Sequence, residues 1–286
     1  MAEYYLRQDL ADLAQGEGAG KLLAWARAEA DRAVSGNIYR SKEGRKTLRF
    51  ERGGRSFFLK LHTGVGWAEI FKNLLQGRLP VVGAANEYRA VQALERIGVD
   101  TLGIAAYACQ GRNPATRQSM IVTDDLVGTV SLEHYCSDWA DSPPDYRLRM
   151  ALILKLADSA RRMHGAGINH RDFYLCHFHL DERSIAQRSL RCYLIDLHRA
   201  QIRGHTPRRW RVKDLAGLYF SAMDCGLSRR DLWRFMHRYS EGGLRRALGV
   251  DAGFWRQVEA RARQLYRKGY SAEQSPVAKP GLPADD

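Results

Sequence analysis

The sequence predicts an α+β fold of two lobes: a first lobe built on an antiparallel five-stranded sheet with one main helix, and a mostly helical second lobe. Short segments of alternating polar and apolar residues, separated by glycine turns, occupy residues 35–123. Longer segments with apolar residues at helical spacing occupy most of residues 129–270. A polar connector at residues 124–128 separates them, so we expect a hinge there and a cleft between the lobes.

Both ends of the chain are expected to lie outside this two-lobed body. Residues 1–34 are predicted to form an N-terminal extension, in which a glycine-rich, loosely packed start precedes a helix at residues 21–34. Residues 271–286 contain three prolines, which predicts a disordered tail.

The first lobe begins with three strands joined by glycine turns, as expected of successive hairpins. The segment from Ala84 to Ile97 has an apolar stripe at helical spacing and stops at Gly98, which predicts the main helix. The strands are expected at residues 37–40, 46–51, 56–62, 103–109 and 119–123, with a shorter helix at residues 68–75.

Helical periodicity dominates the second lobe, where the longest amphipathic segment runs from Tyr146 to His164. Gly165 and Gly167 end this helix, and the stretch Ile168–Leu180 follows as a turn and a short alternating strand. An apolar strand is expected at residues 190–197, and further helices at residues 131–139, 214–225, 231–239 and 253–267.

The composition is strongly basic, with 45 Lys and Arg against 32 acidic residues and a net charge of +13. Such an excess favours an anionic partner, which could be nucleic acid, an anionic lipid surface, a phosphorylated substrate or an acidic protein. The five cysteines are scattered without a C-x-x-C pair, which favours a reducing compartment. No apolar run is long enough to span a bilayer and the first residues lack a signal-peptide pattern, so we expect a cytoplasmic protein.

Four ionisable residues lie at positions where phosphoryl transfer would need them. Lys60 is on a predicted strand, Glu87 is on the main helix, Asp172 is in the turn His170-Arg171-Asp172, and Asp196 ends a strand. Their order and spacing resemble the protein-kinase superfamily. The resemblance implies that Lys60 and Glu87 bind the nucleotide, that Asp172 is the catalytic base within its triplet, and that Asp196 holds magnesium. The alternative is a structural ion-pair network in an unrelated α+β domain.

The sequence departs from the protein-kinase pattern in ways that favour a small-molecule or glycan kinase. The glycine-rich loop is reduced to a turn with Gly44 and Arg45, which we expect to bind the nucleotide phosphates. His177 stands where a second metal ligand, normally Asn, is expected, although imidazole is a poor magnesium ligand. Asp214 matches a buried residue that braces the catalytic loop. Asp124 and Leu126 of the connector complete the expected nucleotide site.

Four blocks of sequence narrow the resemblance: residues 44–49, 58–67, 69–74 and the stretch 168–180. Together they look like the lipopolysaccharide core heptose(I) kinase family of Gram-negative bacteria, with likeness from about residue 30 to residue 268. This implies ATP- and magnesium-dependent phosphorylation of the first heptose of the inner core, at the cytoplasmic face of the inner membrane.

The basic charge fits such an acceptor, which carries carboxylates and phosphates. The expected partners are a lipid-linked core oligosaccharide, the anionic inner-membrane surface and a small acidic protein, and no nucleic acid is expected. Arg171 and the basic residues between Arg199 and Lys213 are candidates for acceptor binding. Arginines of the helix at residues 229–238 are candidates for contact with the membrane.

Two other functions stay open from the sequence. One is a kinase for another small acceptor of the Kdo or aminoglycoside type, although a basic chain suits a cationic aminoglycoside poorly. The other is a non-catalytic, pseudokinase-like docking module, suggested by His177 and the missing glycine-rich loop. A zinc site at Cys176, His177 and His179 is disfavoured, because no second ligand pair lies nearby.

Overall fold

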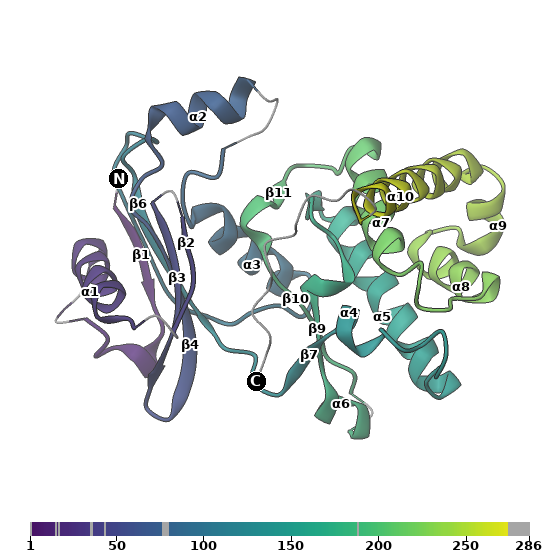
Figure 1. Ribbon diagram of the computed structural model, residues 1–286, viewed down its shortest axis with the longest axis horizontal. Helices are drawn as coiled ribbons and strands as arrows, with labels where there is room; N and C mark the ends of the chain where they lie inside the picture. The colour runs from purple at the N-terminus through teal and green to yellow at the C-terminus, as the bar shows by residue number, and fades with distance from the viewer. Residues whose placement is uncertain are drawn as a thin grey trace.

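The computed structural model describes residues 2–14, 16, 18–34, 37–42, 44–75, 80–187 and 189–273. A sheet-based lobe and a helical lobe lie side by side, joined by the segment after residue 124 (Figure 1). This is the predicted α+β, two-lobed arrangement.

The sheet of the first lobe is antiparallel and contains six strands in the order β1-β5-β6-β4-β3-β2. The strands are β1 (Glu3–Leu6), β2 (Ile38–Lys42), β3 (Arg45–Arg52), β4 (Arg55–His62), β5 (Ile104–Gln110) and β6 (Gln118–Asp124). Five were predicted, and the sixth is β1, which pairs with β5. A strand with one buried face alternates buried and exposed residues, but β1 has only four residues and the neighbours Tyr4 and Tyr5 are both exposed. The sequence of β1 therefore shows no strand period.

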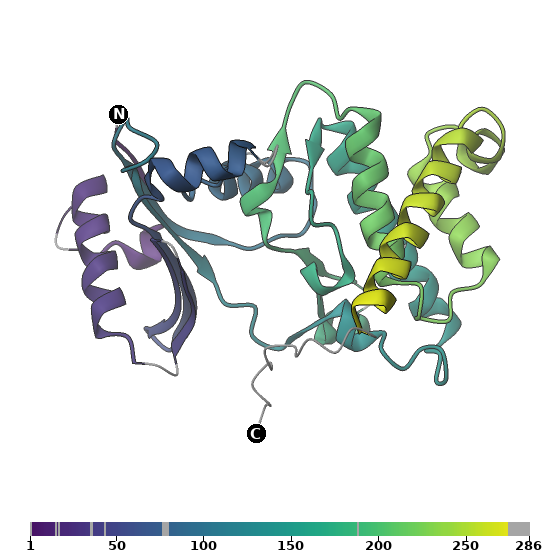
Figure 2. The same cartoon turned by 45° about the horizontal axis from the view of Figure 1, so that its top comes forward.

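The expectation of a loosely packed N-terminus was therefore wrong. Leu10 and Leu13, in and after the 3-10 turn η1 (Gln8–Leu10), are buried beneath α1 (Ala19–Arg32). The apolar side of α1, which includes Leu22 and Ala26, packs on one face of the sheet (Figure 2). The alternation of β4 explains this face, since Leu59 points into that core while its neighbour Lys60 points away.

The opposite face of the sheet is covered by α3 (Ala85–Arg96), whose buried residues Val91 and Leu94 contact Tyr107 and Ile121. The short helix α2 (Gly66–Leu75) follows β4 and lies at one end of the lobe (Figure 1).

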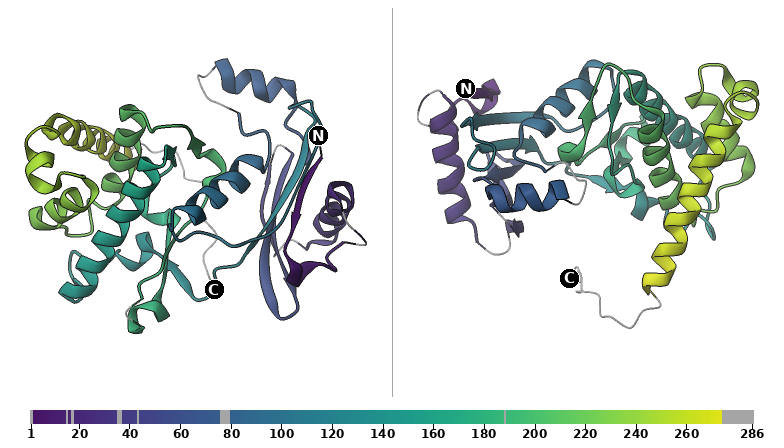
Figure 3. Two further views of the ribbon diagram at one scale, coloured as in Figure 1. Left: turned by 180° about the vertical axis from the view of Figure 1, so that it is seen from behind. Right: turned by 90° about the horizontal axis from the view of Figure 1, so that it is seen from above.

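The second lobe contains the helices α4 (Leu132–Tyr135), α5 (Tyr146–Gly165), α6 (Glu182–Ala186), α7 (Arg208–Ser221), α8 (Arg229–Tyr239), α9 (Gly243–Leu248) and α10 (Ala252–Glu273), shown from two further sides in Figure 3. Its small sheets have the orders β10-β9-β7, with β7 (Thr129–Ser131), β9 (Phe178–Asp181) and β10 (Cys192–Leu194), and β11-β8, with β8 (Ile168–Asn169) and β11 (Gln201–Ile202).

Several predicted boundaries in this lobe were wrong. The helix expected at residues 131–139 is the shorter α4, and the strand expected at residues 190–197 is β10, so Asp196 lies two residues beyond the strand. Helix α7 begins at Arg208 and not at Asp214, because Pro207 precedes the first turn and suits a helix start. Residues 271–273 of the predicted tail belong to α10, and residues 274–286 lie outside the described residues. Within the described chain, no helix is both long and apolar enough to cross a bilayer.

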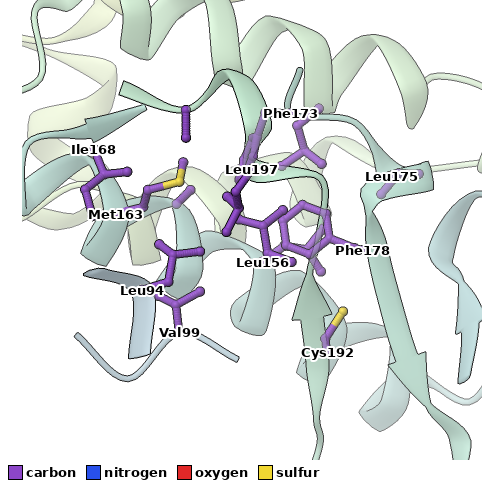
Figure 4. Packing of buried hydrophobic residues seen from close by; sticks show 14 of the residues in the cluster. Leu94, Val99, Leu156, Met163, Ile168, Phe173, Leu175, Phe178, Cys192 and Leu197 are labelled. Atoms are coloured by element: carbon purple, nitrogen blue, oxygen red, sulfur yellow. The ribbon is translucent and has the colours of Figure 1, made fainter. Parts of the chain in front are cut away.

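One hydrophobic core continues from α3 into the helical lobe. Leu94 and Val99 lie beside Leu156, Met163 and Phe178 in the packing shown in Figure 4. Because burial of such side chains stabilises each by roughly 1.5–3 kcal/mol, this shared core holds α3 firmly against the stretch Ile168–Leu180. The two lobes therefore present their ionisable residues in a defined relative position.

Candidate active site

The ion pair predicted between strand and helix is present. Lys60 Nζ on β4 lies 2.6 Å from Glu87 Oε1 on α3, and the Glu87 side chain is only 1% exposed. A carboxylate buried this deeply requires a charged partner, and the pair orients the Lys60 ammonium. The charge of Lys60 also contributes to lowering the pKa of Asp196 in the second lobe.

The turn His170-Arg171-Asp172 is held from below by Asp214. The Asp214 carboxylate is fully buried and accepts hydrogen bonds from the backbone amides of His170, at 2.7 Å, and Arg171, at 2.8 Å. Arg171 has φ of 78°, a conformation that costs a non-glycine residue about 1–3 kcal/mol unless its surroundings hold it. Asp214 on α7 therefore supplies the bracing that the sequence predicts.

The Asp172 carboxylate faces Arg199. Nη1 of Arg199 lies 2.9 Å from each carboxylate oxygen. Arg199 comes from the 3-10 turn η4 (Leu197–Arg199), directly after Asp196. The sequence indicated only that Arg199 belongs to the basic residues between Arg199 and Lys213. Its contact with Asp172 is seen only in the structure.

Asp196, like Arg171, adopts a left-handed backbone conformation, with φ of 62°. One of its oxygens lies 2.6 Å from His198 Nδ1 and the other 3.6 Å from His177 Nε2. Burial acts to raise the pKa of Asp196, but the hydrogen bond from His198 and the charges of His198, Lys60 and His177 hold that pKa below its usual range. The carboxylate is thus ionised and ready to bind a cation.

His177 connects the two aspartates. Its Nδ1 lies 2.7 Å from the Asp172 carbonyl oxygen, while Nε2 faces Asp196. Burial acts to lower the pKa of His177, but contacts with Cys176, the Asp172 carbonyl and Asp196 outweigh it and raise the pKa to about 9. A protonated imidazole has no lone pair for a metal, so this geometry favours a cationic bridge over metal ligation.

Among the described residues, no group of three or more His, Cys, Asp or Glu side chains is arranged to hold a metal ion. Magnesium is commonly held by one or two carboxylates together with substrate phosphates, and not by a protein cage. The ionised Asp196, partly open to solvent, fits that mode.

The other residues predicted to bind the nucleotide are Gly44, Arg45, Asp124 and Leu126, and each of them contacts another part of the chain. Gly44 has φ of 70°, and its carbonyl accepts a hydrogen bond of 2.8 Å from the Thr63 amide, so this turn rests on the loop after β4. Arg45 donates a hydrogen bond to the Val81 carbonyl. The Asp124 carboxylate binds Arg7 and Arg55, and so serves the N-terminal segment. The Leu126 carbonyl caps the turn to β7 by accepting hydrogen bonds from Thr129.

A basic cluster surrounds the indole of Trp210, beside the turn His170-Arg171-Asp172. We define the Trp210 cluster as Trp210 with Arg171, Arg203, Arg209 and Lys213, whose charged groups lie 5.3–5.8 Å from its rings. Burial lowers the pKa of Lys213 and of Arg171, and in each case neighbouring arginines add to that effect.

The carboxylates nearest the Trp210 cluster are already engaged, Asp172 by Arg199 and Asp214 by backbone amides. In the part of the chain that is described, Arg171 Nε and Trp210 Nε1 are buried without a hydrogen-bond partner. Excess positive charge and unused donors suit an anionic ligand. Sequence reasoning missed Trp210 itself, although its position within the run of basic residues from Arg199 to Lys213 was a usable signal.

A separate apolar cavity of about 740 Å³ lies among α5, α7, α8 and α10. It is lined by side chains such as Leu152, Leu156, Leu218 and Trp255, with Arg229 and Arg263 also at its wall. No pattern in the sequence pointed to it, since its lining comes from helices far apart along the chain.

Comparison with known proteins decides the family. Residues 29–239 match the model of the lipopolysaccharide kinase (Kdo/WaaP) family. The chain belongs to this family. It is 49% identical over 238 residues to the lipopolysaccharide core heptose(I) kinase WaaP of Escherichia coli, covering 83% of this chain and 90% of that one. It is 48% identical over 241 residues to the WaaP of Pseudomonas aeruginosa, covering 84% and 90%.

A solved structure described as WaaP in complex with acyl carrier protein matches with a TM-score of 0.77 and 39% identity, covering 92% of this chain and 99% of that one. The predicted kinase-like fold is thereby confirmed. The predicted activity is confirmed as well: the chain is an ATP-dependent phosphotransferase that acts on heptose of the lipopolysaccharide core. The predictions of a different small acceptor and of a non-catalytic module lose their support, because these relatives are named heptose kinases.

Proposed function

We propose that Asp172 is the catalytic base of this heptose kinase. The observation that carries the proposal is the convergence of Asp172, His177 and Asp196 with the Lys60–Glu87 pair at one site. Asp172 accepts the proton of the acceptor hydroxyl while the oxygen of that hydroxyl forms a bond to the γ-phosphorus. The bond from that phosphorus to the bridging oxygen breaks, and ADP leaves with the electron pair.

The other residues position the reactants. Lys60, oriented by Glu87, binds the phosphates of ATP, and Asp196 holds magnesium, which neutralises charge on the transferring phosphoryl group. Arg199 aims the Asp172 carboxylate through its two contacts of 2.9 Å. His177 places a positive charge beside the Asp196 carboxylate and holds the main-chain carbonyl of Asp172, at the position where other kinases use a second metal ligand.

The test is the pair Asp172→Asn and Asp172→Glu. Loss of a positioned base typically lowers turnover by about 10²–10⁴-fold, so we expect that loss for Asp172→Asn with little change in melting temperature. Phosphate transfer would be measured by mass spectrometry of purified core lipopolysaccharide after incubation with ATP and magnesium. Wild-type turnover by Asp172→Asn would rule out the assignment.

We infer that the Trp210 cluster binds acidic groups of the acceptor. Its support is the concentration of basic side chains beside Asp172 and the two buried donors without partners. Carboxylates and phosphates of a lipid-linked inner-core oligosaccharide have the required charge, and arginine can bind them through two hydrogen bonds. Arg203→Ala should therefore raise KM for the acceptor more than KM for ATP.

We further propose that this protein binds an acyl carrier protein, as the related WaaP structure is described as doing. The excess of 45 basic over 32 acidic residues suits an acidic carrier, and the apolar cavity has room for an acyl chain. Ala222→Phe places a large side chain at the wall of this cavity. We expect it to reduce binding of an acylated carrier to the level of the unacylated form, measured by calorimetry.

A further inference from the structure

Helix α2 exposes an apolar face. Trp67, Phe71, Leu74 and Leu75 are 49%, 57%, 49% and 89% exposed, and Ile70 is the one residue of this helix that is buried. Their spacing of three and four residues places them on one side of the helix, and the rings of Trp67 and Phe71 lie 5.8 Å apart. A clustered face of this kind marks an interaction surface, whereas single exposed apolar residues do not.

Basic side chains border this face. Lys72 on α2 itself has a side chain 62% exposed and lies 3.4 Å from Glu69 one turn earlier, and the charge of Arg45 also reaches Glu69. The loop at residues 111–117 contacts the start of α2 through a hydrogen bond of 2.9 Å from the Gly66 amide to the Ala115 carbonyl, and it contributes Arg112 and Arg117. An apolar stripe beside basic residues is the pattern of a helix that lies in the interface of an anionic bilayer.

The sequence suggested the arginines of α8 as membrane contacts, but two of them form ion pairs within the protein. Arg234 lies 2.9 Å from Asp231, and Arg238 also pairs with a carboxylate, that of Asp158. Lys72 of α2 is paired as well, so the decisive difference is that α8 lacks the exposed apolar side chains of α2.

We propose that α2 docks this protein on an anionic phospholipid surface through Trp67, Phe71, Leu74 and Leu75. The inference deepens the proposed function, since a lipid-linked acceptor requires the enzyme to reach the membrane. Helix α2 starts four residues after the end of β4, the strand of Lys60, so docking there keeps the phosphate-binding strand close to the lipid surface.

The test compares two double variants of the full chain for binding to vesicles, without ATP or acceptor. Phe71→Ser/Leu75→Ser removes two exposed apolar side chains of α2, and Val34→Ser/Val250→Ser removes two elsewhere that are 67% and 87% exposed. With vesicles of phosphatidylglycerol and phosphatidylethanolamine, we expect the α2 variant to bind about tenfold more weakly or less, and the control to bind like wild type. Vesicles of phosphatidylcholine should bind all three poorly.

A second measurement reports insertion directly. Trp67 is the most exposed of the six tryptophans, so quenching of fluorescence by brominated lipid chains should occur in wild type and decrease in Trp67→Phe. Equal vesicle binding by both double variants would overturn the proposal, and so would α2 variants that lose association with a protein but not with vesicles. Phosphorylation of a soluble, delipidated acceptor should be unchanged in Phe71→Ser/Leu75→Ser. If the wild-type protein failed to phosphorylate the soluble acceptor, that result would contradict the proposed function and leave the proposed role of α2 unaffected.

Discussion

Arg199 controls the orientation of the proposed base, because one guanidinium nitrogen contacts both oxygens of Asp172. Arg199→Ala should leave the carboxylate free to rotate, and a misplacement of about 1 Å can lower turnover by roughly 10²-fold. We expect a fall in kcat with a small change in KM for ATP, and partial recovery in Arg199→Lys. Arg32→Ala, whose guanidinium lies 3.4 Å from Glu29 on α1 of the first lobe, is the control. Equal kcat for wild type and Arg199→Ala would contradict this role.

His177 is expected to replace part of the charge that magnesium provides in other kinases. In His177→Asn the cation beside the Asp196 carboxylate is lost. More of the positive charge must then come from magnesium, so the site should require more of it, by roughly 10–100-fold as for other residues that support a metal site. A magnesium titration of initial rates at fixed ATP measures this. Identical titration curves for wild type and variant would show that His177 only packs.

His62 on β4 makes the fold sensitive to acid. It is 7% exposed, its Nδ1 has no hydrogen-bond partner among the described residues, and burial lowers its pKa to about 3. An unfolded histidine titrates near 6.5, so the unfolded state binds the proton more readily and stability falls as the pH drops from 6.5 towards 3.

Between pH 7 and pH 5, this histidine alone should lower the free energy of unfolding by about 2 kcal/mol. His62→Gln should remove that part of the pH dependence in urea denaturation. His205 is exposed, so His205→Gln serves as the control and should leave the slope unchanged. A steep acid slope that persists in His62→Gln would assign it to other groups.

At the scale of elements, the N-terminal segment contributes ion pairs and a paired strand to the first lobe. Arg7, directly after β1, donates hydrogen bonds of 2.7 and 2.8 Å to Asp124, which begins the connector between the lobes. The segment also covers β5, whose exposed edge would otherwise invite pairing with another chain.

Arg7→Ala should lower the free energy of unfolding by about 1.5–3 kcal/mol, because a partly buried carboxylate loses charged hydrogen bonds. Asp9→Ala removes the more exposed partner of Arg7 and should cost less than about 1 kcal/mol. Chemical denaturation of both variants, with circular dichroism as readout, compares them. Equal losses would mean that the link to Asp124 contributes no more than a surface ion pair.

At the scale of the whole molecule, the nucleotide should act on both lobes together. Lys60 belongs to the first lobe and Asp196 to the second, and one hydrophobic core joins them. A ligand bound only by the native state at 100 times its Kd stabilises it by about 2.7 kcal/mol, which corresponds to a rise in Tm of roughly 5–10 °C.

A thermal-shift assay with ATP, with and without magnesium, tests this. We expect the largest rise with both present, and Asp196→Asn should lose the part that depends on magnesium while keeping the part due to ATP alone. An unchanged Tm at millimolar ATP would favour a protein that does not bind nucleotide.

Several features of the fold and the site could be predicted, because each depends on a pattern within a short stretch of sequence. The alternation around Lys60, the apolar stripe of α3 around Glu87 and the turn at Asp172 identify their elements within a few residues of sequence. Strand β1 was not predictable in this way, since four residues with two exposed tyrosines show no period and only pairing with β5 makes them a strand. Helix α2 was predicted, but the exposure of its apolar face depends on which side chains the rest of the protein covers. Only the tertiary structure shows this.

The sequence by itself determined the kinase-like order of Lys60, Glu87, Asp172 and Asp196, because each lies in or next to an element that a short stretch of sequence identifies. Only the tertiary structure decided how the charges pair. Arg199 meets Asp172 across 27 residues, and Arg7 meets Asp124 across 117. The physical reason is that the free energy of a charged group depends on the burial and charge around it, which folding assembles from distant parts of the chain.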